Sequence, residues 1–291
     1  MDDVLAYNEV LDSRHDFPSI ARTLYSNYHT FMQDVNVWEL LENVLPKEYY
    51  QSIEHLKEDT LGHQIINDFV MRHYPGEQKL KYELTKRYIN RDSEISAYEI
   101  NVNKSRLDVG RINGKSYAYE IKTELDSLEK LEKQVSDYSE VFEYTYVVVH
   151  PCHFKKVMNI VPEHCGVITY REVSGDFKFS FRKRVDKSPY LNKSSMLRNL
   201  NSKELDYILK SSKYEGSLPV ERDDKHEILL KLSDQKINAL FKRALKQRYN
   251  KQWGNLCQNF GKVYPIDVQA VFKSGISPEL IYFKNSSNVL R

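Results

Sequence analysis

Three residues in the middle of the chain could do chemistry together: Asp108, Glu120 and Lys122. They lie in two strand-like segments, 105–110 and 116–122, which an Asn-Gly pair separates. Because Asn and Gly tolerate positive φ, this pattern is typical of a β-hairpin. Glu120 and Lys122 are two residues apart in a strand and therefore project from the same face. Two carboxylates and an ammonium on one face could bind a hard cation such as Mg²⁺ or Mn²⁺.

The length of the hairpin loop decides whether Asp108 shares that face. A two-residue loop at 113–114 would put Asp108 on the face opposite Glu120. A three-residue loop, Ile112–Gly114, would pair Asp108 with Ala118, on the same face as Glu120 and diagonal to it. We expect the three-residue loop, because it brings the two carboxylates together.

An amphipathic segment follows the second strand and carries Gln134 and Tyr138, which are neighbours on one side of a helix. The order of Asp, hairpin turn, apolar strand, Glu-x-Lys and a helix with Gln-x-x-x-Tyr resembles the PD-(D/E)XK nuclease superfamily. The similarity covers about residues 70 to 170. The proline that precedes the aspartate in that family is Leu107 here.

The resemblance implies a role for each matching residue. Asp108, Glu120 and the carbonyl of Ile121 would bind Mg²⁺ or Mn²⁺. Lys122 would position the attacking water or offset the charge that develops in the transition state. Gln134 would lie beside the catalytic face and help to position it or the substrate.

Families of this kind often place a further acid on the first core helix. Glu77, at the start of the helical pattern 77–89, is one candidate for that acid and for a metal ligand. Glu99, in the strand before Asp108, is the competing candidate. A carboxylate in the first turn of a helix also has a purely structural explanation, because the helix dipole stabilises it there.

The function that the resemblance implies is that of a metal-dependent nuclease, with DNA as the expected substrate and a bacterial or phage origin. The alternative is a module on the same fold that binds nucleic acid or recruits a partner without cleavage. A third reading is an unrelated α/β protein with a chance Glu-x-Lys, because the motif is short.

Composition limits the class of protein. The chain has 291 residues with 41% hydrophobic content and no apolar run of 18 residues, so we expect no membrane segment. Three cysteines and the acidic start Met1-Asp2-Asp3 favour a cytoplasmic protein. Residues 1–177 carry a net charge of −10 and residues 178–291 one of +12. The basic part could attract phosphates, or could be a solvated helical surface without a ligand.

Strand-like and helix-like patterns alternate in the centre of the chain and predict an α/β fold. The run 144–150 is almost wholly β-branched and aromatic, which predicts a central strand that is buried on both faces. With the resemblance, we expect a restriction-endonuclease-like mixed sheet flanked by helices. The chain would divide into a helical N-terminal extension (1–60), an α/β core (61–185) and a basic helical region (186–291). The helical extensions could form a homo-oligomer.

Overall fold

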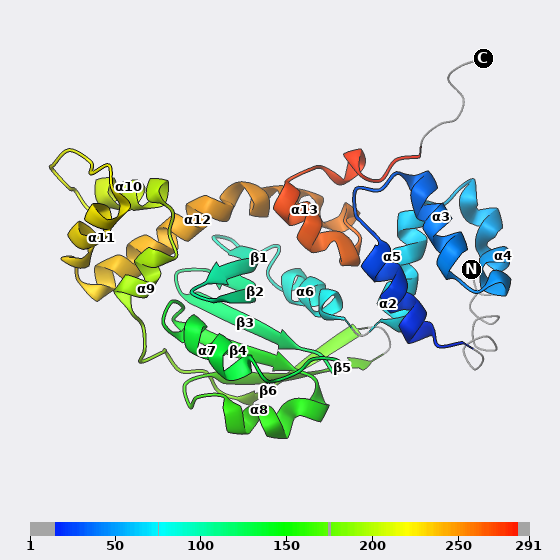
Figure 1. Cartoon of the computed structure of the whole chain (residues 1–291), viewed down its shortest axis with the longest axis horizontal. Coiled ribbons are helices and arrows are strands. Elements are labelled where there is room, and N and C mark those ends of the chain that lie inside the picture. The colour runs from blue at the N-terminus through cyan, green and yellow to red at the C-terminus, as the bar shows by residue number, and fades with distance from the viewer. Residues whose placement is uncertain (1–14, 75, 174–175, 285–291) are drawn as a thin grey trace, which may run out of the picture. The chain divides into compact units, whose positions relative to one another are not determined.

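The computed structural model describes residues 15–74, 76–173 and 176–284, and these form two compact units (Figure 1). The first unit comprises residues 1–82 and 255–291, and the second comprises residues 83–254. The units divide the chain at other positions than the predicted segments, because the two ends of the chain belong to one unit. The acidic start at residues 1–3 lies outside the described residues.

A six-stranded mixed sheet forms the centre of the second unit, with its strands in sequence order. β1 pairs with β2, β2 with β3 and β5 with β6 in antiparallel fashion, whereas β3–β4 and β4–β5 are parallel. The predicted mixed α/β fold, with helices flanking the sheet and further helices towards both termini, is therefore confirmed. The strands are β1 (Ile95–Val102), β2 (Ser105–Ile112), β3 (Ser116–Lys122), β4 (Tyr144–Val149), β5 (Gly166–Val173) and β6 (Asp176–Lys183).

β4 lies between two parallel neighbours, as its β-branched composition indicates. Val147, Val148 and Val149 are fully buried. The prediction that both faces are buried is wrong for the first half of the strand, because Tyr144 and Tyr146 are only half-buried. One face of the sheet is thus partly open where these tyrosines lie.

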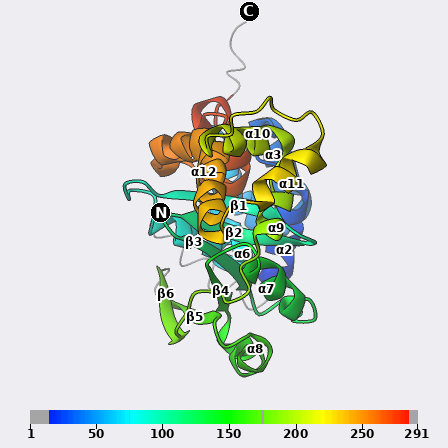
Figure 2. The same cartoon turned by 90° about the vertical axis from the view of Figure 1, so that its left-hand side faces the viewer.

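Helices α7 (Leu131–Ser139) and α8 (Phe154–Ile160) cover the other face of the sheet (Figure 2). Leu131 and Val135 from α7 and Val157 from α8 form a buried cluster with Val147 and Val149 of β4. These side chains exclude water from one side of β4 and β5, and each fully buried aliphatic side chain contributes about 1.5–3 kcal/mol.

The end of α6 (Glu77–Lys86) and the turn after it lie on the opposite face, over the first three strands. The hydroxyls of Thr85 and Tyr98 form a hydrogen bond, and those of Tyr88 and Tyr119 are 3.5 Å apart. The remaining helices of the second unit are α9 (Lys193–Arg198), α10 (Ser202–Ser211), α11 (Arg222–Leu230) and the greater part of α12 (Asp234–Asn259).

The long basic helix α12 uses several of its cations inside the protein. Lys246 Nζ donates to the carbonyl of Ser93 at 2.6 Å, and Arg248 pairs with Glu204. Lys242 Nζ donates to the carbonyl of Gly114. These cations therefore hold the helix against its own unit, which favours the interpretation of the basic part as a helical surface without a ligand over one that attracts phosphates.

Glu143 is the main anchor of this helix. Its buried carboxylate accepts hydrogen bonds from Lys242 Nζ, Asn238 Nδ2 and the backbone N–H of Ser116, each at 2.9 Å. Burial acts to raise the pKa of Glu143, but the hydrogen bonds from Lys242, Asn238 and Ser116 outweigh it and lower the pKa. The carboxylate is thus stabilised in its ionised form.

We expect Glu143→Ala to lower the free energy of unfolding by about 3 kcal/mol, because it leaves the Lys242 ammonium without its buried partner. Urea denaturation measures this loss, and the exposed Glu129→Ala should change stability by less than about 0.5 kcal/mol.

A glutamate with a lowered pKa stabilises the fold above its ordinary pKa of 4.5, and this contribution is lost as pH falls through the lower folded-state value. A difference between wild type and variant that did not shrink in acid would contradict this account.

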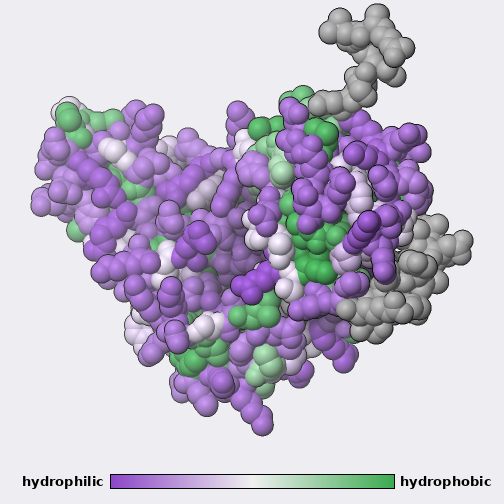
Figure 3. Space-filling model, turned by 45° about the vertical axis from the view of Figure 1, so that its right-hand side comes forward, coloured by the Kyte–Doolittle hydropathy of each residue, from purple (hydrophilic) through white to green (hydrophobic). Residues whose placement is uncertain are grey.

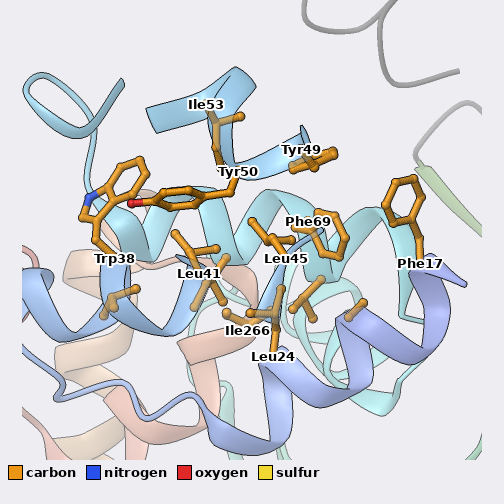
Figure 4. Close-up of a cluster of buried hydrophobic side chains, with 14 residues drawn as sticks. Phe17, Leu24, Trp38, Leu41, Leu45, Tyr49, Tyr50, Ile53, Phe69 and Ile266 are labelled. Atoms are coloured by element: carbon orange, nitrogen blue, oxygen red, sulfur yellow. The ribbon is translucent and has the colours of Figure 1, made fainter. Parts of the chain in front are cut away.

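The first unit is helical and has its own hydrophobic core (Figure 4). Trp38 and Leu41 from α3 meet Leu24 from α2 and Phe69 from α5 in this core. The buried apolar side chains of the N-terminal helices therefore form a core, whereas Phe31 is exposed. Among the described residues, the α-helices that lie wholly in this unit are α2 (Phe17–Asn27), α3 (Asp34–Val44), α4 (Lys47–Ile53), α5 (Gly62–His73) and α13 (Val268–Ser274).

A buried carboxylate, Asp267, ties the two chain ends of the first unit together. It accepts hydrogen bonds from the hydroxyls of Tyr28, Thr30 and Tyr282 at 2.7–2.9 Å. Burial raises the pKa of Asp267, while these three hydroxyl donors and the charge of His63 act to lower it.

None of the described helices is both long and apolar enough to span a membrane. The surface in Figure 3 is mostly hydrophilic, with small apolar patches between polar side chains. Single exposed apolar residues are normal on a folded protein.

Candidate metal-binding site

The β2–β3 hairpin closes through a three-residue loop, Asn113–Lys115, with the N–H of Asn113 donating to the carbonyl of Lys115 at 3.0 Å. Neither loop considered from the sequence is correct, since the loop begins one residue later than the expected one. Gly110 pairs with Ala118, and the same register places Asp108 directly opposite Glu120. The two carboxylates thus lie on one face of the sheet, side by side rather than diagonally.

Glu99 extends this pair into a row. The β1–β2 register places Glu99 opposite Asp108, between the pairs Tyr98–Val109 and Ile100–Leu107. Carboxylate oxygens of Glu99 and Asp108 lie within 4.8 Å of each other. Three acids from three adjacent strands, Glu99, Asp108 and Glu120, are therefore aligned at one level of the sheet; we call them the carboxylate row.

Glu99 has an unusual backbone conformation, with φ of +53°. Residues other than glycine rarely adopt this left-handed region, and such outliers often occur at functional sites. The conformation interrupts the ladder of β1 and β2 at this position. Glu99 Oε2 pairs with Arg106 Nε at 2.5 Å, and the Arg106 side chain is exposed.

Asp108 sits where β2 and β3 stop pairing. Its Oδ2 accepts a hydrogen bond from the backbone N–H of Ile121 at 2.7 Å. The side chain thereby satisfies a main-chain donor of β3. This bond gives Asp108 a structural role that would exist without any ligand.

Glu120 is almost fully buried, at 1% exposure, and both of its oxygens have partners. Oε1 accepts from Lys122 Nζ and Oε2 from the Tyr138 hydroxyl, each at 2.8 Å. The Tyr138 hydroxyl also lies 2.9 Å from the carbonyl of Arg106 in β2. Helix α7, through Tyr138, therefore holds the Glu120 end of the carboxylate row in place.

Burial raises the pKa of Tyr138 far above the ordinary tyrosine range, and the charge of Glu120 and its hydrogen bond raise it further. A hydrogen bond with Gln134 acts in the opposite direction. Tyr138 therefore stays protonated and can only donate to Glu120. Gln134 Oε1 is buried and has no hydrogen-bond partner among the residues that the structure describes. The predicted Gln-x-x-x-Tyr pair thus lies beside Glu120.

Glu77 begins α6 and belongs to the first unit, where its Oε1 accepts from Lys81 Nζ at 2.9 Å. Its role at the site stays a prediction, as does that of the Ile121 carbonyl. Glu99 was the competing candidate for the additional acid, and it is the one that lies in the carboxylate row within the second unit.

Three carboxylates in the row face two cations, Lys122 and Arg106, so the local charge is negative. Carboxylate oxygens are hard ligands of the kind that Mg²⁺ and Mn²⁺ prefer. The arrangement can therefore attract a divalent cation, and Lys122 places an ammonium next to it.

The fold and this site define the chain as a mixed-sheet α/β protein with aligned acids on three neighbouring strands. A family model described as bacteriophage P4 protein cII matches residues 71–271, and the chain belongs to this family. Protein cII of Enterobacteria phage P4 is 28% identical over 145 residues. That match covers 50% of this chain and 55% of the relative, so the chain spans about half the length of the curated relative it matches.

Among solved structures, a protein of unknown function from Silicibacter pomeroyi, SPO1766, matches with a TM-score of 0.31 and 12% identity. The match covers 50% of this chain and 97% of that protein. A likeness at this level carries no argument about function.

Proposed function

We propose that the chain is a metal-dependent nuclease that hydrolyses phosphodiester bonds in DNA. The observation that carries this proposal is the carboxylate row, with Lys122 held against its Glu120 end. Membership in a phage protein family agrees with the expected phage origin. The order of these residues along the chain is that of the PD-(D/E)XK superfamily, which the sequence resembles.

The donor set fits a divalent cation. Asp108 and Glu99 would hold Mg²⁺ or Mn²⁺, because their carboxylate oxygens lie within 4.8 Å of each other. Glu120 would act directly or through a water molecule. When bound, the cation lowers the pKa of water and neutralises charge on the phosphate.

Lys122 then has two possible tasks at the reacting phosphate. Its Nζ, bonded to Glu120 Oε1 at 2.8 Å, can orient a water molecule by donating a hydrogen bond to it. The ammonium can also offset negative charge that develops on the phosphate oxygens in the transition state. Tyr138 holds Glu120 in place, so that the carboxylate keeps Lys122 in one position.

A cleavage assay tests the proposal on supercoiled plasmid, linear duplex DNA, single-stranded DNA and RNA. We expect cleavage of DNA with Mg²⁺ or Mn²⁺ and none after chelation by EDTA, because carboxylates alone cannot neutralise the phosphate. Activity should return when Mg²⁺ is added in excess of the chelator. Equal cleavage with and without EDTA would contradict metal dependence, and cleavage of RNA alone would contradict the choice of DNA.

Nucleic-acid binding without cleavage is the second candidate. It is favoured by the contacts of Glu120, whose two oxygens are both engaged by protein donors. Isothermal calorimetry with Mg²⁺ and Mn²⁺ separates the candidates. A nuclease site should bind a cation and lose this binding in Asp108→Asn, whereas a binding module would show no heat from either ion.

A further inference from the structure

The half-open face of the sheet carries a set of stacked aromatic rings. Tyr117 of β3 stacks on Tyr144 of β4 with ring centroids 5.2 Å apart, and Tyr119 stacks on Tyr146 at 5.4 Å. Phe181 of β6 approaches Tyr146 edge-on at 6.0 Å. We call these five residues the aromatic face. Tyr146 alternates along β4 with Val147, which packs against α7, so the aromatic face lies on the opposite side of the sheet from α7 and α8.

A glycine makes room for this arrangement. Gly166 pairs with Tyr146 across β4 and β5. A Cβ at Gly166 would lie 2.5 Å from atoms of the Tyr146 ring, which real contacts do not allow. The absence of a side chain lets the Tyr146 ring lie over β5, towards Phe181.

Cations lie close to these rings. Arg111 is 4.7 Å from the Tyr117 ring and 4.0 Å from that of Tyr88, and Lys115 is 5.2 Å from the Tyr144 ring. The carboxylate of Glu94 on this face is already paired with Arg111. This pairing neutralises the buried Arg111, so the positive charge that this end of the aromatic face offers a ligand is that of the exposed Lys115.

The outer edge of the face is both apolar and basic. Phe181 is 70% exposed, although it is a large apolar side chain. β6 is the edge strand, and its own cations belong to the other side of the sheet, where Arg182 donates to the Thr169 hydroxyl and Lys183 to the carbonyl of Pro162. Arg87 lies over the ring of Phe179 at 4.6 Å. No helix of the second unit covers the part over β4–β6 among the described residues (Figure 2).

We propose that the aromatic face binds single-stranded DNA, with bases stacked on the exposed rings and phosphates near the exposed cations Lys115 and Arg87. Aromatic rings beside cations are the combination that single strands require, because unpaired bases expose their faces and phosphates carry the charge. A duplex hides its base faces and would gain only the electrostatic part. The choice of DNA over RNA rests on the proposed function, whereas the binding of a single strand does not.

Fluorescence anisotropy with a labelled 20-nucleotide dT oligomer in EDTA tests this site on the full chain. We expect Phe181→Ala to weaken binding about tenfold, because stacking on one ring is worth roughly 1–3 kcal/mol. Phe181→Tyr should retain the affinity, since it keeps the ring. Because Phe181 is exposed, its truncation should leave the melting temperature unchanged.

Tyr190 supplies a matched control. It is an exposed aromatic residue that contacts His164, whose ring nitrogen is hydrogen-bonded to Ser139 of α7, so it belongs to the other face of the sheet. Tyr190→Ala should bind the oligomer within twofold of wild type. Unchanged affinity in Phe181→Ala, or tighter binding to blunt duplex DNA or to single-stranded RNA of matched length, would overturn the proposal.

These outcomes are separate from the nuclease hypothesis. Binding in EDTA that depends on Phe181, together with no cleavage in Mg²⁺, would leave the aromatic face established and the nuclease rejected. Cleavage that depends on Asp108, with full oligomer binding by Phe181→Ala, would give the reverse result.

Discussion

Asp108→Asn is expected to reduce Mg²⁺-dependent cleavage on the order of a thousandfold, because it removes one charge from the carboxylate row. An asparagine is nearly the same size, and its Oδ1 can still accept the hydrogen bond from the N–H of Ile121. The substitution therefore separates the structural role of the side chain from its role as an anion. Asp108→Ala loses both roles and should also lower the melting temperature.

Asp126→Asn is the matched control for this experiment. Asp126 Oδ2 also accepts a backbone N–H, that of Thr123, at 2.7 Å. It lies outside the carboxylate row, so its neutral variant should cleave at the wild-type rate. If Asp108→Asn cleaves as fast as Asp126→Asn, the side chain of Asp108 serves only the fold and the nuclease proposal fails.

Lys122→Met should reduce the rate of cleavage about 10²- to 10³-fold, which is typical when a donor to the transition state is lost. Methionine preserves much of the volume of lysine but cannot donate or carry charge. The KM for DNA should change little, because one buried lysine contributes little to the overall attraction for a long phosphate backbone. Initial rates on a labelled duplex at saturating Mg²⁺ measure both quantities.

Loss of Lys122 also leaves the buried Glu120 without its cation, so stability falls for a reason unrelated to catalysis. The double variant Glu120→Gln, Lys122→Met removes both charges and should recover part of the lost stability while it stays inactive. The exposed Lys133→Met on α7 should behave as wild type in both assays. Recovery of activity together with stability in the double variant would show that the pair is structural.

The β2–β3 hairpin shows how much of the site could be predicted from the sequence. The Asn-Gly pair and the apolar strand after it indicate a turn, but the same sequence is compatible with loops that begin at different residues. The observed loop, Asn113–Lys115, begins one residue later than the expected one. When the three-residue loop shifts by one residue along the chain, each residue of β2 pairs with a β3 residue two positions further on. The side-chain period of a strand is also two, so Asp108 and Glu120 share a face in both registers.

The sequence predicts less about the backbone at Glu99 and about the aromatic face. The left-handed conformation of Glu99 cannot be inferred from local propensity, which disfavours it for a glutamate. The spacing of tyrosines two apart in both β3 and β4 was a usable signal, because alternate residues of a strand share a face. Pairing between those strands had to be known before the rings could be placed side by side.

The cations of α12 show why net charge is a poor guide to a surface. The charge of +12 over residues 178–291 suggested a phosphate-binding region. Lys242 and Arg248 instead neutralise carboxylates of their own unit, and Lys246 donates to a carbonyl. Only the three-dimensional partners distinguish such internal cations from those that are available to a ligand.

The backbone at Glu99 has a consequence for how this chain could change. A left-handed residue with a side chain costs roughly 1–2 kcal/mol, a penalty that glycine avoids. Selection for thermal stability alone would favour glycine at position 99. The carboxylate of Glu99 is therefore present at a cost to the stability of the fold. A laboratory selection for thermostable variants should therefore find substitutions of Glu99 early, and each stabilising substitution at this position would remove one acid from the carboxylate row.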